Sequence, residues 1–438
     1  MSFIKQFTFW LAVIFLTAGC FHKSNTTGTA DDIKHSFTCH TPKGDYLITH
    51  EEVFHATSKS SGPKGTFISG STDYRYTVRD LKTGAQVTRL VTGDRDEDLF
   101  PIGYDGKQLW CYSPDKKVGL HAREPLTMAV TITLEQLEKE NPSLAGNINM
   151  PKIYEAPQFY SYDPVSSSII FTDLQGIFYS LDPKTLKATP IKKKPSFSNR
   201  FSDGHSSNAL RSNSVRINLS GELRKQVDLG RDNKSEDSYL SGEILIEQNT
   251  GRLAAIAAQL MQGNIAVFQK QQQEYDSLLK LYPVLKDQSK AYLNMKDYHI
   301  IDHFYDLQSN LSSKSRDSAS KNDDIISSLS SIALGGDSNT IYILHANNLT
   351  DTGSTLISKV SIKENKAVTL WTSMIPQIYF NPSKGIKRNG MADVFKSGNP
   401  QFSYEWYGVE GNVLVGIKML FAFGIDTNTG KLLWKQQL

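Results

Sequence analysis

The chain of 438 residues lacks several features that mark common classes of protein. Three cysteines are too few for a disulfide-built scaffold or a zinc ribbon. The 48 basic residues nearly balance the 45 acidic ones, and a net charge of +3 is too small for a typical nucleic-acid-binding protein. At 39% hydrophobic residues, the chain still has enough apolar side chains to build a packed core.

The common sequence signatures of catalysis are missing too. The chain contains no Gly-x-Ser-x-Gly elbow, no phosphate-binding P-loop and no His-Glu-x-x-His zinc motif. His121 and the nearby Arg123-Glu124 pair offer acid–base side chains, but the sequence supplies no nucleophile, base and orienting group as a set. We therefore expect a protein that is not an enzyme, with no catalytic residues and no cofactor.

What the sequence does contain begins with a short apolar segment at the N-terminus. Lys5 is the only charged residue of the first 20, and an uncharged run of 13 residues from Phe7 to Gly19 leads to Cys20. A helix that spans a bilayer needs about 20 apolar residues, so this run has the length of a cleavable signal peptide instead. The segment resembles the signal of bacterial lipoproteins, in which the cysteine after the cleavage site is acylated.

The resemblance implies an address for the mature protein. Residues 1–19 would be removed, and Cys20 would carry the lipid chains, palmitate among them, that insert into the bilayer. Residues 20–35 would form a flexible tether. Phe21 stands where an aspartate usually retains such lipoproteins in the inner membrane, which implies the outer membrane, with the body facing the periplasm. A plain secretory signal with an incidental cysteine is the alternative.

The two remaining cysteines, Cys39 and Cys111, have two interpretations. In an oxidising periplasm they can form a disulfide bond, which would stabilise the fold by a few kcal/mol because it closes a long loop. Alternatively, they are two separately buried thiols, as is common for cysteine. The sequence does not distinguish the two, because it does not show whether the Cβ atoms meet.

From residue 36 onward, short alternating runs bounded by Gly, Asp and Asn predict an all-β fold. The final run, from Phe423 to Trp434, is the most informative, because two predicted strands flank a five-residue turn. The Asp426 carboxylate can accept backbone N–H groups in that turn, and Gly430 can adopt the positive φ that closes it. Trp434 is then expected to pack against neighbouring structure.

Weaker copies of this hairpin recur upstream. The acidic or equivalent position falls at residues 80, 124, 182, 247, 306, 363 and 426, at intervals of 44 to 65 residues. The copies supply further candidate turn residues and one further packing tryptophan: Asp80, Gly84, Asp182, Glu247, Gly251 and Trp371.

A hairpin that recurs at such intervals predicts a β-propeller, since one four-stranded sheet cannot bury its faces alone whereas a ring of sheets can. Seven copies predict seven four-stranded blades over residues 36–438, with six or eight as alternatives; a pair of β-sandwiches would also fit. The segment from Ile425 to Trp434 resembles the repeat of the PQQ-type, quinoprotein-like propellers. Outer-membrane lipoproteins of that fold include the propeller subunit of the β-barrel assembly machine.

Two kinds of segment interrupt the pattern. Residues 195–242 and 309–332 are rich in Ser and Asn and predict long polar loops. Residues 268–290 predict a short helical insertion, and the run from Tyr298 to Phe304 predicts a strand.

Three clusters of charged or metal-ligating residues are candidate ligand sites, and we predict no bound metal at any of them. Asp94, Asp96 and Asp98 with Asp105 occupy four positions of a calcium-loop frame, but Leu99 replaces the glycine that the frame needs, which favours a solvated acidic loop. His299 and His303 lack a third ligand in sequence. Five lysines favour a solvated hairpin over a lipid-binding or partner-binding patch: Lys184, Lys187, Lys192, Lys193 and Lys194.

These observations together predict a non-catalytic lipoprotein propeller that binds a protein partner of the cell envelope, with no nucleic acid involved. One alternative is a propeller that binds a small ligand or a glycan, with Trp371, Trp406 and Tyr407 as stacking aromatics. A PQQ-dependent dehydrogenase is the less favoured alternative, because no two cysteines adjoin and the calcium frame is broken.

Overall fold

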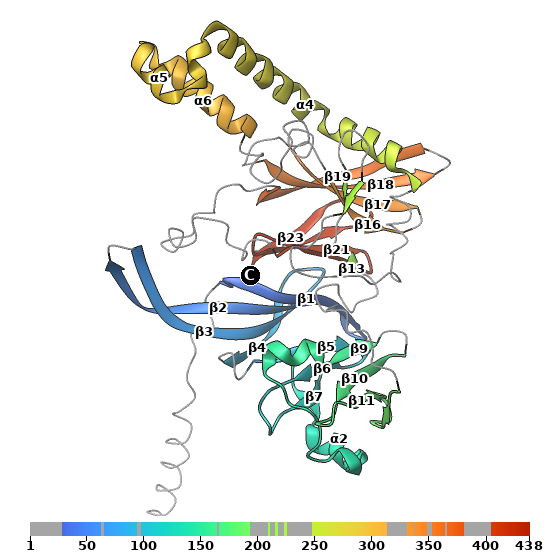
Figure 1. The fold of residues 1–438 in the computed structure, drawn as a ribbon. Helices are drawn as coiled ribbons and strands as arrows, with labels where there is room; N and C mark the ends of the chain where they lie inside the picture. Colours follow the sequence, from blue (N-terminus) through green and yellow to red (C-terminus); the bar gives the residue numbers. More distant parts are fainter. Residues whose placement is uncertain are drawn as a thin grey trace, which may run out of the picture.

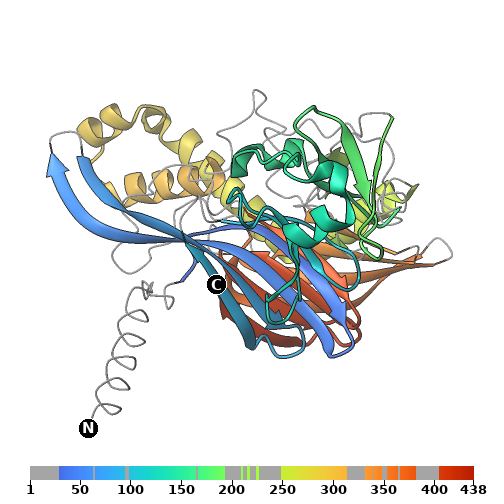
Figure 2. The ribbon, with the colours of Figure 1, turned by 90° about the horizontal axis from the view of Figure 1, so that it is seen from below.

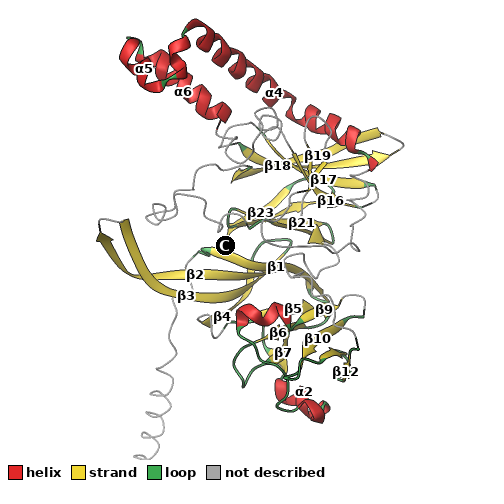
Figure 3. Cartoon of the chain, viewed as in Figure 1, coloured by secondary structure: helices red, strands yellow, loops and turns green. Residues whose placement is uncertain are grey.

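The computed structural model describes residues 29–62, 65–93, 98–163, 166–192, 209–210, 215–217, 223–225, 248–312, 331–337, 339–347, 353–363, 366–380 and 404–438. These residues form five antiparallel sheets and a smaller set of helices (Figure 3). The predicted β-rich class is therefore confirmed. The first strand begins at Asp32, so the folded body starts four residues before the predicted boundary at residue 36.

The first three sheets follow one another along the chain, and each has four strands in sequential order. The first sheet contains β1 (Asp32–Thr41), β2 (Gly44–Gly62), β3 (Gly65–Asp80) and β4 (Gln86–Gly93). The second contains β5 (Phe100–Tyr104), β6 (Leu109–Tyr112), β7 (Leu120–Arg123) and β8 (Val130–Ile132). The third contains β9 (Ser161–Asp163), β10 (Ser168–Thr172), β11 (Phe178–Leu181) and β12 (Ala188–Pro190).

The last two sheets each combine four sequential strands with short strands from the middle of the chain. The fourth sheet has the order β15 (Leu223–Lys225), β14 (Val215–Ile217), β16 (Ser331–Gly336), β17 (Thr340–Ala346), β18 (Ser354–Lys363) and β19 (Lys366–Tyr379). The fifth has the order β13 (Ala209–Leu210), β20 (Trp406–Glu410), β21 (Val413–Lys418), β22 (Phe421–Asp426) and β23 (Leu432–Gln437).

The sheets are stacked in an arc in which the fifth sheet lies between the fourth and the first (Figure 1). Each neighbouring pair shares a buried apolar cluster: the fourth with the fifth, the fifth with the first, the first with the second, and the second with the third. Burial between sheets supplies the main stabilisation, because each sheet exposes too much apolar surface to be stable alone. At the junction of the fifth and first sheets, the amide of Ala30 donates to the carbonyl of Leu438 at 2.7 Å.

Two elements project from this stack (Figures 1 and 2). One is the outer part of the β2–β3 hairpin. β1 pairs with β2 only as far as Glu52, and β4 pairs with β3 only as far as Tyr74, so the remainder continues as a two-stranded arm. The other is the long helix α4 (Thr250–Leu281), which leaves the fourth sheet at an angle.

The helices correct two predictions. The expected short insertion at 268–290 is a larger unit that consists of α4, η4 (Pro283–Lys286), α5 (Gln288–Asn294) and α6 (Tyr298–Ser312). The strand expected from Tyr298 to Phe304 is the start of α6. Ile301, Phe304 and Leu307 are all buried, and their spacing of three residues places them on one helical face. Three shorter helices lie between the second and third sheets: α2 (Leu134–Glu140), η2 (Pro142–Leu144) and η3 (Ile153–Gln158).

A recurrent turn joins the last two sequential strands of each sheet. It follows Asp80 in the first sheet, Asp182 in the third and Asp426 in the fifth, and the carboxylate of each accepts a backbone N–H two residues on. Gly84 and Gly430 close their turns at φ of 71° and 72°, as predicted. The equivalent turn at Glu124 is also present, and Lys363 pairs with Lys366 in the fourth sheet, although residues 364 and 365 between them are outside the described residues.

Two of the seven predicted hairpin turns are not confirmed. Gly251 lies in the first turn of α4, and the candidate at residue 306 lies inside α6, so neither joins two strands. Glu247, which belongs to the same predicted hairpin as Gly251, is outside the described residues. Residues 193–208, which contain Lys193 and Lys194, are outside them too.

Candidate functional site

The two repeat tryptophans join neighbouring sheets. Trp371, on β19, donates its indole N–H to the carbonyl of Thr427 at 3.0 Å, across the boundary between the fourth and fifth sheets. A Cβ at Gly430 would lie 2.7 Å from Cδ2 of the same indole, so glycine is required there for packing as well as for φ. The predicted packing role of Trp371 is confirmed.

Trp434 makes the same arrangement at the boundary between the fifth and first sheets. Its indole N–H donates to the carbonyl of Leu81 at 2.7 Å, and a Cβ at Gly84 would lie 2.5 Å from Cδ2 of the ring. The turn residues Asp80, Gly84, Asp426 and Gly430 therefore have a structural role, since they form the surfaces on which the tryptophans pack.

Two of the aromatic residues proposed to stack on a glycan are not accessible to one. Trp406 is completely buried and Tyr407 is 2% exposed, in the clusters that the fifth sheet shares with its neighbours. Trp371 packs against a turn. Stacking on a sugar needs an accessible ring face, so the proposed roles of Trp406 and Tyr407 are wrong.

Cys39 and Cys111 are both free thiols and both buried. They belong to the same apolar cluster, between the first and second sheets. Burial raises the pKa of each thiol, to about 12 for Cys111. A thiol with so high a pKa is a weak nucleophile at neutral pH. Cys20 lies outside the described residues.

The acidic stretch does not form a calcium loop in its described part. Residues 94–97 are outside that part, but Asp98 is buried and its Oδ1 accepts from His50 Nε2 at 2.9 Å. Asp105 accepts three hydrogen bonds from its own turn and from the indole of Trp110. Both carboxylates are therefore occupied by protein donors.

The pair of histidines on α6 is not brought to a third ligand among the described residues. His303 Nε2 lies 2.9 Å from Oε1 of Glu274 on α4, and both side chains are about half exposed. Of the predicted basic patch, Lys187 pairs with Glu140 at 2.8 Å on the surface. The structure thus gives these groups ordinary surface partners.

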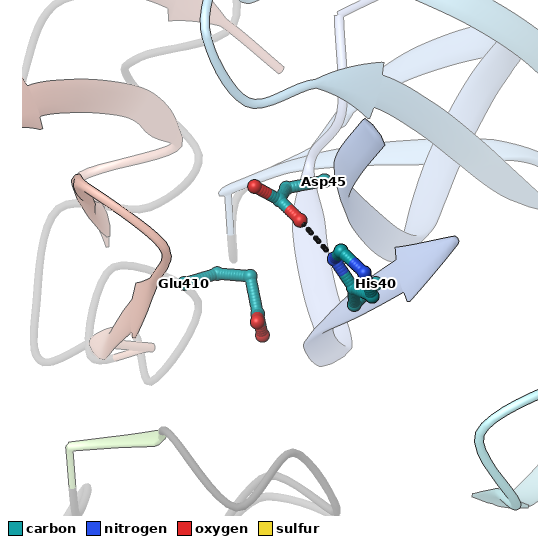
Figure 4. Close-up of side chains that lie close together, drawn as sticks. All are labelled: His40, Asp45 and Glu410. Atoms are coloured by element: carbon teal, nitrogen blue, oxygen red, sulfur yellow. Dashed lines mark hydrogen bonds and ion pairs between the residues drawn. The ribbon is translucent and has the colours of Figure 1, made fainter. Parts of the chain in front are cut away.

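A cluster that the sequence did not predict lies where the fifth sheet meets the first (Figure 4). His40 is the last but one residue of β1, Asp45 is the second residue of β2, and Glu410 ends β20. One ligand atom from each side chain lies within 4.8 Å of the other two. No sequence signal could find this cluster, because Glu410 comes from the other end of the chain.

The cluster is held by contacts on both sides. His40 Nδ1 lies 2.6 Å from Oδ1 of Asp45, and this hydrogen bond raises the pKa of the imidazole. Thr38 donates to Oε2 of Glu410 at 3.2 Å, and the hydroxyl of Tyr104 donates to the backbone carbonyl of His40 at 2.7 Å. The side chain of His40 is 72% exposed, so the cluster is open to solvent.

The helical unit presents a second candidate surface. The first turns of α4 pack on the fourth sheet through Leu253, Ala254 and Ile256. The outer turns carry η4, α5 and α6 around a small core of their own, which includes Leu285, Ala291, Ile301 and Phe304.

At the end of the helical unit, three apolar or aromatic side chains stay accessible. Leu293 is 82% exposed, Tyr298 is 55% exposed and Tyr292 is 40% exposed. The rings of Tyr292 and Tyr298 stack with centroids 6.0 Å apart, so they form one surface. We refer to Tyr292, Leu293 and Tyr298 as the tip patch.

Comparison with known proteins finds no matching family model, no similar curated protein and no similar solved structure. Among the described residues, no helix combines the length and apolar character needed to cross a membrane.

Proposed function

We propose that the protein is an outer-membrane lipoprotein whose sheets form a β-propeller, and that its helical unit binds a protein of the cell envelope. The tip patch is the observation that carries the binding role. Interface centres are enriched in Tyr, and Leu293, which directly follows Tyr292 in α5, is 82% exposed.

The arrangement of the sheets supports the propeller. Five antiparallel sheets stack face to face in an arc, and the C-terminal sheet lies against the N-terminal one. Two tryptophans dock on recurrent turns in the same way at successive boundaries. The hairpins predicted at residues 247 and 306 do not support a count of seven blades, so the proposal is a propeller of at least five blades, and an experimental structure of the whole chain tests the count.

The shape of the helical unit supports a binding role. α4 is 32 residues long, which at 1.5 Å per residue carries its far end about 48 Å along the helix axis from the start. The small core that α4 forms with η4, α5 and α6 keeps the tip patch in a fixed orientation. A pre-organised surface at the end of a long helix can reach a partner with little loss of conformational entropy on binding.

In-cell photocrosslinking tests the binding role. A photoreactive residue at position 293 should capture one reproducible envelope protein, while the same residue at position 174 should not. Leu174 is the matched control because it is a leucine, 61% exposed, in the turn between β10 and β11 of the third sheet. We expect Leu293→Asp to reduce recovery of the partner about tenfold and Leu174→Asp to leave it unchanged. Equal capture at both positions, or none, would count against the proposal.

The lipid anchor has a separate test. We expect the full-length protein to incorporate labelled palmitate and to fractionate with outer membranes, and Cys20→Ser to abolish both. A Cys20→Ser protein that remained in the membrane fraction would contradict an acyl anchor at this position.

A further inference from the structure

We propose that His40, Asp45 and Glu410 bind a divalent transition cation such as Zn²⁺, and that the bound ion ties the first sheet to the fifth. One imidazole and two carboxylates are a ligand set that suits zinc, with the remaining coordination positions left to water. The inference stands on the three side chains and does not require that the proposed partner exists.

The geometry of the cluster is close to that of a bound site. Bonds of about 2.0–2.1 Å in tetrahedral coordination place neighbouring ligand atoms about 3.3 Å apart. The present ligand atoms start at 2.6 Å for His40 Nδ1 and Asp45 Oδ1, and all lie within 4.8 Å. The exposed His40 side chain can make the small adjustment by rotating, because solvent and not protein surrounds most of it.

The negative charges of the cluster also favour a bound cation. One oxygen of each carboxylate lies within 4.8 Å of the other and of a ring nitrogen of His40, so two negative charges face the same small region. A divalent ion would displace the proton now shared by His40 Nδ1 and Asp45 and would neutralise both carboxylates. Gly411, at φ 55°, lets the chain approach Asp45 closely, since a Cβ there would lie 3.0 Å from Oδ2.

The origin of the ligands defines what binding would do. His40 and Asp45 flank the β1–β2 turn of the first sheet, whereas Glu410 ends β20 of the fifth. An ion that holds all three adds a link between two sheets that also meet through apolar packing and through hydrogen bonds, among them those of Trp434 and Thr38. Binding to the folded state alone raises the melting temperature by mass action.

Titration of the metal-free full-length protein with Zn²⁺ tests the proposal. We expect one saturable site per chain by calorimetry, an upward shift of the melting temperature, and slower hydrogen exchange of the β1–β2 turn. His40→Ala and Glu410→Gln should each weaken binding about 100-fold or more and abolish the thermal shift. Mg²⁺ should not reproduce the effect, because it prefers oxygen ligands.

The exposed His303–Glu274 pair is the matched control. It also places an imidazole beside a carboxylate, at 2.9 Å, but with no third ligand among the described residues. His303→Ala should therefore leave Zn²⁺ binding and the thermal shift intact. The proposal is overturned if no saturable site is found, or if His40→Ala and Glu410→Gln bind Zn²⁺ as the wild type does. The bridging role would also be overturned if Zn²⁺ slowed hydrogen exchange in the first sheet alone and did so equally in Glu410→Gln.

Discussion

Trp434 and Leu81 are 353 positions apart in the chain, and the indole N–H of the first donates to the carbonyl of the second at 2.7 Å. This bond lies at the boundary where the fifth sheet meets the first, within an apolar cluster that both sheets supply. The contact therefore reports directly on whether the two ends of the folded body are joined.

Replacing this tryptophan should weaken the boundary in two separable steps. Trp434→Phe keeps an aromatic ring but removes the donor, and we expect a loss of about 1–2 kcal/mol because the Leu81 carbonyl is left unpaired in a buried place. Trp434→Ala also leaves a cavity and should cost about 3–5 kcal/mol. Denaturant unfolding measures both. An unchanged stability of Trp434→Phe would show that the hydrogen bond contributes nothing, and equal losses in the two variants would show that the packing of the ring adds nothing to it.

Gly430 should tolerate a methyl group poorly for two reasons that a control can separate. Its φ is 72°, and a Cβ would lie 2.7 Å from the Trp371 ring. Gly176 has a similar φ of 80° but no atom within 4 Å of its Cβ position. We expect Gly176→Ala to cost about 1 kcal/mol from backbone strain alone and Gly430→Ala to cost about 1–3 kcal/mol more. Comparable melting temperatures for the two variants would refute the packing argument.

Glu51 and Glu52 are adjacent in the first sheet, but substituting them should change the stability by very different amounts. Glu51 is fully buried, between Arg75 Nε at 2.5 Å and Arg79 Nη1 at 3.1 Å. Burial alone would raise the pKa of Glu51, but the two guanidinium groups outweigh it and lower the pKa. We expect Glu51→Gln to cost about 3–5 kcal/mol, because it removes the negative charge that lies between two buried arginines.

The neighbouring Glu52 provides the control for this substitution. It pairs with Lys34 at 2.6 Å near the surface, where ion pairs contribute about 0–1 kcal/mol. Glu52→Gln should therefore change the melting temperature by only a few degrees at most. Similar destabilisation by the two variants would mean that the buried group is not the source of the effect.

His121 predicts a loss of stability in mild acid. Its Nδ1 lies 2.9 Å from the Gly119 carbonyl and its Nε2 accepts from Arg123 Nε at 2.9 Å, so only the neutral imidazole satisfies both contacts. Burial, with the charge of Arg123, lowers the pKa to about 4. The unfolded chain therefore takes up this proton near pH 6.5 while the folded chain does not, and stability should fall between pH 6.5 and 4.

The size of this effect is bounded by the shift in pKa. For His121, a pKa lowered from 6.5 to about 4 corresponds to about 3 kcal/mol of folding stability, which is present in full above pH 6.5 and is lost as the pH falls toward 4. His345, whose pKa burial also lowers to about 4, should add to the loss. Melting temperatures measured from pH 7 to 4 check the direction, and His345→Gln should flatten the profile. A melting temperature that rose over this range would contradict the assignment.

The turns were predictable because their signal is local. Asp426 and Gly430 are four residues apart, and the carboxylate and the positive φ act within one hairpin. The same locality misled at Gly251, where Asn-Thr-Gly also occurs at the start of a helix. Over seven residues, the run from Tyr298 to Phe304 has too few buried positions to separate a strand period from a helical one, and only Leu307 extends the pattern.

The two candidate sites could not be predicted, because they depend on where sheets and helices pack. His40 and Asp45 show no unusual spacing, and Glu410 reaches them only because the fifth sheet stacks on the first. Likewise, Leu293 is one apolar residue among many in the sequence, and its exposure follows from the way α5 packs beside η4 and α6. Long-range packing, not local chemistry, determines both.

The β2–β3 arm has a consequence for strand registry. From residue 55 outward its described side chains are mostly polar and none is buried, so a shift of one residue would not move apolar groups from a core into water. Pairing in the arm is therefore fixed at its base, where Tyr76 and Val78 are completely buried, and is transmitted outward through a bulge at Ala56 to Ser58. The outer arm is the part of the first sheet in which alternative pairings differ least in free energy.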